Sequence, residues 1–326
     1  MITRMPTARR PGLTLTEALV AMFVAALGMI SLLTLFPLGA LQMGQALKDS
    51  RTAEAARQAD SLMRNYWRDA VEQRQTYDPN MFTSMNNPPT GTPAHPMVSV
   101  AVDTTVSASY PVFLDPIGDF SQTGTANSWV TGANQPGLPR RNLINSVTGS
   151  FQQRLRFCTL LDDLTYDVTG TGAPTASVPV ERGGRYNWLA IVQRPAHSSE
   201  NLANLSILVF DGRAPGYAIP NGEAVFTPTL LSGSALTFTY TGARPPVSKG
   251  RWIALHTLVE ATAANPTKTN VLQFYRVVSA NDEVAGTLDI ELQTPIRSEQ
   301  LNFSTTRVIV FTGLSEVFER PQLNGK

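Results

Sequence analysis

A long apolar run dominates the N-terminal part of the chain. Between Leu13 and Leu47 the only charged residue is Glu17. A helix over residues 13–36 would be roughly 36 Å long, because each residue adds about 1.5 Å, and a bilayer core is about 30 Å thick. The polar exceptions in this stretch are Thr14, Thr16, Ser31 and Thr34. Such hydroxyls bond to carbonyls one turn earlier, so they cost little in lipid. The pattern predicts a membrane-spanning helix over residues 13–40.

At Leu41 the pattern changes to the three- and four-residue spacing of an amphipathic helix. The apolar face consists of Ala55, Ala56, Ala59, Leu62, Met63, Tyr66, Trp67, Ala70 and Val71. Charged side chains fill the other face, and the Asp78-Pro79 step ends the pattern. We therefore predict a helix over residues 41–78. We expect its aromatic stripe to pack on a soluble domain, with binding of a partner as the alternative.

Pro37 lies where the two predicted helical segments meet. Proline has no backbone N–H and its ring crowds the preceding turn, so the helix is predicted to be kinked or broken there. The alternative is that Pro37 marks the outer interface of the membrane. The two interpretations are compatible.

Patterns typical of β-strands fill the C-terminal half of the chain, with turn residues between them. The strongest predicted strands are residues 186–192, 205–210, 235–240, 252–259, 271–278, 288–292 and 308–311, preceded by weaker ones at 97–102 and 110–114. Residues 279–286 predict a hairpin loop, and residues 314–326 a polar tail. The fold class is therefore predicted to be α+β. A long N-terminal helix packs on a mostly antiparallel, β-rich domain over residues 79–326.

Composition adds three constraints. The chain has 326 residues and a net charge of +1, so it lacks the basic footprint of a nucleic-acid-binding protein. Its single cysteine, Cys158, excludes an intramolecular disulfide. In its apolar surroundings this residue is expected to be a buried structural thiol.

The charges around the apolar run predict its orientation. Arg4, Arg9 and Arg10 precede it, whereas the charges just after Leu47 nearly cancel. The basic leader should remain in the cytoplasm, which puts the bulk of the chain outside. A cleaved secretory signal is disfavoured because the run is too long and lacks a small-x-small site. A plain signal anchor explains everything except Gly12 and Glu17.

Glu17 requires an explanation, because a carboxylate in a membrane helix costs several kcal/mol unless it is paired, protonated or near an interface. Cleavage after Gly12 would give Leu13 an α-amino group, one helical turn from Glu17. That amine, in the same chain or a neighbour, would be a partner for the carboxylate. The alternative is an interfacial glutamate favoured by the helix dipole. The physics alone leaves both open.

The segment at residues 9–21 resembles the prepilin leader and class III signal of type IV pilins and type II secretion pseudopilins. Its sequence is RRPGLTLTEALVA. The resemblance implies that a prepilin peptidase cuts after Gly12 and methylates Leu13, and that Glu17 directs filament assembly. Two positions depart from the commonest pattern: Leu13 stands where Phe or Met is usual, and Thr16 where Ile is usual. The resemblance covers about the first fifth of the chain.

The continuation of the helix is similar to the minor pilin V group and the I-type minor pseudopilin. The residues concerned are Leu27-Gly28-Met29-Ile30, Leu41-Gln42 and Leu62-Met63-Arg64-Asn65. The implied partners are prepilin peptidase, other pilin or pseudopilin subunits, an inner-membrane assembly platform and the lipid bilayer. The implied location is the inner membrane as a single-pass protein, with its C-terminal domain periplasmic or extracellular.

No pattern typical of an enzyme emerges, and we expect no enzymatic activity, no metal site and no cofactor. His95, His197 and His256 lie far apart, and none has metal-ligand spacing to a second His or Cys. Calcium remains an alternative, because related pseudopilins sometimes bind it. The candidate ligands are Asp162, Asp163 and Asp167, but their spacing is not that of an EF-hand, and solvated acids are expected instead.

The main hypothesis is therefore a structural subunit of a filament, with residues 1–12 as its leader. A second hypothesis is a binding module for envelope components on an uncleaved anchor, using exposed loops with Trp129 and Tyr217. An anchored hydrolase is the weakest of the three, since no catalytic constellation supports it.

Overall fold

The computed structural model of the protein describes residues 14–68, 111–116, 140–141, 158–166, 180–195, 202–213, 223–259, 269–282, 284, 286–302 and 304–324. The chain divides into two compact units, residues 1–50 and residues 51–326. The leader, the predicted helix end at Asp78-Pro79 and the predicted strand at 97–102 lie outside the described residues. The α+β prediction is confirmed as one long helix with mostly antiparallel sheets.

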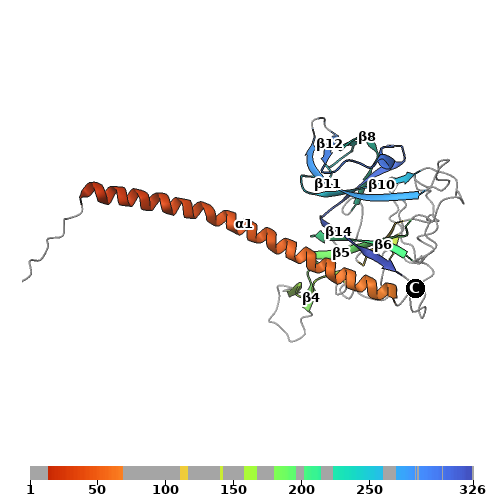
Figure 1. Ribbon diagram of the computed structural model, residues 1–326, viewed down its shortest axis with the longest axis horizontal. Helices are drawn as coiled ribbons and strands as arrows, with labels where there is room; N and C mark the ends of the chain where they lie inside the picture. The colour runs from red at the N-terminus through yellow and green to blue at the C-terminus, as the bar shows by residue number, and fades with distance from the viewer. Residues whose placement is uncertain are drawn as a thin grey trace, which may run out of the picture. The chain divides into compact units, whose positions relative to one another are not determined.

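The helix α1 (Leu15–Trp67) has 53 residues and continues through Pro37 (Figure 1). The two predicted segments form one long helix, and of the two outcomes predicted at Pro37, a kink or a break, the break does not occur. A proline removes one helical hydrogen bond, and strong helix formers such as Leu38, Leu41 and Gln42 follow it, so the helix resumes at once. A bend of the axis at Pro37 stays a prediction.

One sheet of the C-terminal unit has five strands in the order β14-β6-β5-β1-β2. Their bounds are β1 Val112–Leu114, β2 Arg140–Arg141, β5 Tyr186–Gln193, β6 Leu202–Asp211 and β14 Leu314–Asn324. The pairings are antiparallel except that of β1 with β2, which is parallel. A separate two-stranded sheet pairs β3 (Leu164–Tyr166) with β4 (Val180–Arg182).

The C-terminal end of α1 shares a buried cluster with this sheet. Its helical members are Ala55, Ala56, Ala59, Met63 and Trp67. Its strand members include Trp188, Ala190 and Val192 on β5. Cys158 belongs to the same cluster and is buried, as the sequence predicted. Along β5 the intervening residues belong to another cluster, as expected for a strand whose side chains alternate between the two faces.

The second sheet has seven strands, all paired antiparallel, in the order β7-β13-β10-β11-β12-β9-β8. Their bounds are β7 Glu223–Phe226, β8 Pro228–Ser232, β9 Ala235–Thr239, β10 Trp252–Val259, β11 Thr269–Asn281, β12 Thr287–Leu292 and β13 Thr306–Phe311. The outermost strands, β7 and β8, are separated in the chain only by Thr227. The sheet therefore curls back on itself around its own apolar interior, which includes Phe238, Ile253 and Val308.

A third apolar cluster joins the two sheets, which form separate layers of the C-terminal unit (Figure 1). At its centre the Phe311 ring from β13 lies 6.4 Å from that of Phe113 on β1 and 6.3 Å from that of Phe210 on β6, between ring centroids. Aromatic pairs at such separations add to the free energy of burial. This apolar cluster between the two sheets holds them together.

Most of the strong strand predictions are confirmed, including residues 252–259 with the bounds of β10. The predicted hairpin between β11 and β12 is confirmed, but its loop is shorter than the predicted residues 279–286, because β11 continues to Asn281 and β12 begins at Thr287. The polar tail is wrong, since its residues form β14, which pairs with β6 along most of its length. The sequence pattern did not indicate this strand because it contains charged residues and Pro321. Both are tolerated at a sheet edge.

Inside the curled sheet, a polar network is built around Tyr275. Its hydroxyl donates to Oε1 of Gln300 at 2.6 Å and accepts from the backbone N–H of Arg297 at 3.1 Å. The amide nitrogen of Gln300 in turn donates to the carbonyl of Leu255 at 2.9 Å. Burial raises the pKa of Tyr275, because the phenolate would lose its hydration.

This shift predicts a loss of stability at alkaline pH. With the folded-state pKa above the unfolded value of about 10, Tyr275 contributes its full stability below that pH. The contribution is lost as pH rises through the folded pKa. We expect the free energy of unfolding to fall above about pH 10, and to fall less steeply in Tyr275→Phe. Urea unfolding of both proteins from pH 7 to pH 11 tests this, and equal slopes would contradict it.

Candidate functional site

The described part of α1 opens with an N-cap built by Thr14 and Glu17. The backbone N–H and the hydroxyl of Thr14 both donate to Oε2 of Glu17 at 3.0 Å. The N–H of Glu17 reaches back to the hydroxyl of Thr14 at 3.4 Å. This is a capping box, in which a threonine and a glutamate three residues later satisfy each other's backbone donors. Glu17 therefore has a local structural role, which our sequence interpretation missed although the T-x-x-E spacing signals it.

The apolar side chains of residues 15–47 are not covered by other described residues of the chain. Apart from Ala18, residues 15–47 for which exposure is described are exposed, including Leu15 at 80% and Phe36 at 78%. The hydroxyls of Ser31 and Thr34 bond to the carbonyls of Leu27 and Ser31, as expected of polar residues in a membrane helix. The helix is long and apolar enough to cross a membrane, a property that signal sequences share.

The structure describes only part of the predicted processing site. Glu17 and Pro37 lie on α1, whereas Gly12 and Leu13 lie outside the described residues. A pairing of Glu17 with the Leu13 amine therefore stays a prediction. In the structure, the carboxylate of Glu17 accepts hydrogen bonds from Thr14.

The residues considered for chemistry serve structural contacts where they are described. Asp162 forms an ion pair with Arg51 of α1, and Asp163 accepts the backbone N–H of Arg185 at 3.2 Å. His256 is buried on β10, with Nε2 3.1 Å from Oδ1 of Asn270. Within the described ranges, no group of three or more His, Cys, Asp or Glu could hold a metal ion. The other two histidines, Asp167, Trp129 and Tyr217 lie outside those ranges.

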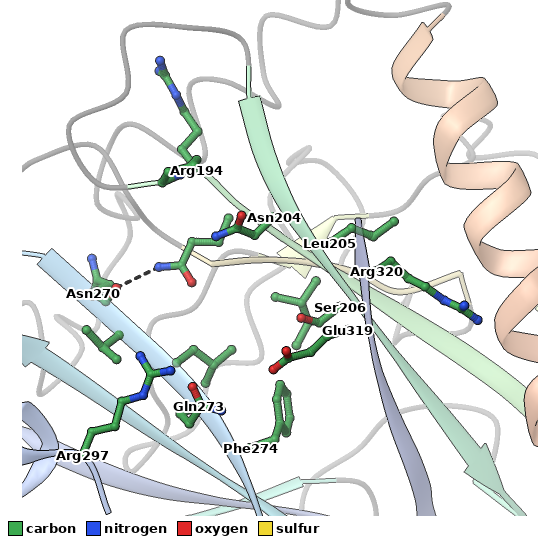
Figure 2. A pocket seen from close by; sticks show the side chains of 15 residues that line it. Arg194, Asn204, Leu205, Ser206, Asn270, Gln273, Phe274, Arg297, Glu319 and Arg320 are labelled. Atoms are coloured by element: carbon green, nitrogen blue, oxygen red, sulfur yellow. Dashed lines mark hydrogen bonds between the residues drawn. The ribbon is translucent and has the colours of Figure 1, made fainter. Parts of the chain in front are cut away.

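A polar pocket of about 510 Å³ lies between the two sheets. It is lined by β5 and β6 on one side, by β11 on the other, and by residues of β14 and the segment before η2 (Ser298–Gln300). The side-chain amide of Gln193 crosses between the sheets at the pocket and donates to the carbonyl of Asn270 at 2.8 Å (Figure 2). Sequence patterns gave no signal for this pocket, because its residues come from strands that only the topology brings together.

The charged side chains around the pocket have different orientations (Figure 2). Arg297 and Glu319 point into the space between β11 and the strands β6 and β14, whereas Arg194 and Arg320 point away from it. Arg320 instead stacks on the ring of Phe318, 5.3 Å from its centroid. The pocket therefore presents one guanidinium and one carboxylate.

Comparisons with known proteins give no match. No family model, no curated protein and no solved structure matches the chain. The function must therefore be argued from the residues and their geometry.

Proposed function

We propose that the protein is a structural subunit, a minor pilin or pseudopilin, of a type IV pilus or type II secretion-like filament. It would be cut by prepilin peptidase after Gly12, methylated at Leu13 and assembled through α1. The observation that carries the proposal is the coincidence of Gly12, Glu17 and a basic leader with a helix that exposes apolar side chains over residues 15–47.

An exposed apolar helix must be covered by something other than water. Burying apolar surface stabilises by about 25 cal/mol per Å², so a bare helix of this kind moves into lipid or against other helices. In the proposal the bilayer covers it first, with the N-terminus in the cytoplasm. Neighbouring subunits then replace the lipid, guided by an inner-membrane assembly platform.

The charge of Glu17 has a specific task in this proposal. In a low-dielectric helix bundle an uncompensated carboxylate is costly, whereas a pair with a neighbour's Leu13 amine is favourable and sets the register. The capping box supports a precise start of the helix at Leu15, which would keep the carboxylate at a fixed height along α1.

The far end of α1 is proposed to pack on the five-stranded sheet and so to link the filament to the periplasmic or extracellular domain. Met63 and Trp67 in the shared cluster support this, as does Arg64, whose guanidinium donates to the carbonyl of Pro321 at 3.0 Å. The Arg51–Asp162 pair adds a third contact.

Two matched substitutions separate the charge of Glu17 from its capping role. Glu17→Gln keeps an acceptor for the cap but loses the charge. We expect it to reduce the protein in the sheared filament fraction at least about tenfold, which corresponds to losing about 1.4 kcal/mol of pairing. Thr14→Ala loses the cap, costs about 0.5–2 kcal/mol of helix stability and should still assemble. Immunoblots of sheared filaments and membranes from the native host measure both.

The opposite outcome would contradict the proposal. If Glu17→Gln assembles like the wild type and Thr14→Ala does not, Glu17 is only a helix cap. Equal membrane levels of both variants serve as the control for insertion.

A second candidate function is a binding module for envelope components held on an uncleaved anchor. The polar pocket between the sheets favours it, because filament assembly through α1 does not require such a pocket. Retention of the leader in the mature protein would support this candidate.

A further inference from the structure

The pocket between the two sheets has the size of a small-molecule site. Its volume is about 510 Å³, within the range of about 300–1,000 Å³ in which proteins bind small ligands. It lies entirely in the C-terminal unit and contains no residue of α1. A ligand here would therefore be additional to assembly through α1, and the inference does not rest on the proposed function.

The two charges that face the pocket limit the charge of a ligand. Arg297 and Glu319 both point into it (Figure 2). Phosphate concentrates its charge in one small group, so it would be attracted by Arg297 but repelled by Glu319, and an amine would meet the reverse. A ligand that satisfies both places one negative group at the guanidinium and, on another part of the molecule, hydrogen-bond donors at the carboxylate.

The neutral groups of the pocket indicate a ligand rich in hydroxyls. Asn204, Ser206 and Gln273 each both donate and accept hydrogen bonds, as sugar hydroxyls do. Leu272 and Phe274 add an apolar wall on β11, suited to the C–H face of a sugar ring. Amides and hydroxyls over an apolar floor thus match a carbohydrate better than a lipid or a simple ion.

A buried hydrogen-bond donor at the edge of the pocket also indicates an oxygen-rich ligand. Asn270 is only 5% exposed, and its Nδ2 has no hydrogen-bond partner within the described part of the chain. Its Oδ1 is within hydrogen-bond distance of His256 and its carbonyl accepts from Gln193. A buried N–H group without an acceptor is unfavourable, and a bound oxygen-rich ligand or its water could satisfy it.

We propose that this pocket binds a short acidic oligosaccharide. Its carboxylate meets the guanidinium of Arg297, and its hydroxyls bond to Glu319, Ser206 and the amides of Asn204 and Gln273. Guanidinium–carboxylate pairs are strong and directional, so Arg297 sets the preference for an acidic over a neutral sugar.

Calorimetric titration of the full-length chain tests the proposal. The chain is held in lauryldimethylamine oxide, a detergent without a sugar headgroup, and the probes are digalacturonate, maltose and inorganic phosphate. We expect digalacturonate to bind at millimolar concentration or below, and at least about tenfold more tightly than maltose and phosphate. Arg297→Ala should weaken digalacturonate binding about tenfold or more. The hydrogen bond of Arg297 to Tyr275 uses the backbone N–H, so this variant keeps it.

Two further variants guard against a folding artefact. Glu319→Ala changes an exposed residue of the edge strand β14 and should weaken digalacturonate binding several-fold. Arg244→Ala removes the same charge as Arg297→Ala from an exposed ion pair with Asp282, and should leave binding unchanged. No binding of digalacturonate, equal binding of maltose, preferential binding of phosphate, or unchanged affinity in Arg297→Ala would each overturn the proposal.

Discussion

Replacing Asp115 by alanine is expected to lower the free energy of unfolding by about 3–5 kcal/mol. Asp115 follows β1, and its side chain and that of Arg213, just after β6, are 0% and 1% exposed. The two guanidinium nitrogens donate to the two carboxylate oxygens at 2.6 and 3.2 Å. The substitution takes this bidentate carboxylate away from a buried guanidinium, and breaking a buried ion pair by removing one side chain is strongly destabilising.

Urea unfolding of the full-length chain in detergent, followed by tryptophan fluorescence, measures this loss. Arg57→Ala is the control, since its pair with Glu54 is exposed at both ends and should contribute less than about 0.5 kcal/mol. The double variant Asp115→Leu/Arg213→Met should recover most of the loss, because it removes both charges together. A loss below about 1 kcal/mol in Asp115→Ala would contradict the importance of the pair.

Replacing Trp67 by alanine is expected to cost about 3–5 kcal/mol as well. Trp67 is the last residue of α1 and is 1% exposed in the cluster that the helix shares with the five-stranded sheet. The truncation leaves a cavity that neighbours such as Trp188 cannot fill without moving.

The same unfolding assay tests the Trp67 prediction, with the fluorescence of the three remaining tryptophans as probe. Leu161→Ala is the control, since Leu161 is 76% exposed and its truncation should change stability by less than about 0.5 kcal/mol. If Trp67→Ala behaves like Leu161→Ala, the end of α1 is not part of the core. The proposed link between helix and domain would then fail.

The fold could be predicted where local pattern and burial agree. The strand β10 alternates between two apolar clusters, with Ile253 and Leu255 in one and Ala254 in the other, so its apolar run was recognisable. The apolar face of α1 was equally clear, because Ala55, Ala59 and Met63 are all buried at helical spacing.

Other strands could not be predicted because they form only through pairing with another strand, which the local sequence does not show. The strands β7 and β8 are short and separated by one residue, and they are stabilised by opposite ends of the curled sheet. The strand β14 carries Glu316, Glu319 and Pro321, which an isolated pattern assigns to a tail. Pairing with β6 and side chains such as Leu314 and Leu323 make it a strand.

The two candidate sites, at Glu17 and in the pocket, also differ in whether the sequence alone could predict them. Glu17 is visible in the sequence, because its spacing to Gly12 and Thr14 is local. The pocket residues Arg297 and Glu319 lie on segments that come together only through the topology of two sheets. Local spacing is therefore enough to predict a processing signal, whereas a binding pocket can be predicted only from the tertiary structure.

Cleavage after Gly12 is tested by N-terminal mass spectrometry of the protein extracted from membranes of its native host, with active prepilin peptidase. We predict a terminal peptide that begins at Leu13 and is heavier by one methyl group. A mature protein that still carries Arg9 and Arg10 would contradict it, and would leave α1 as a permanent anchor.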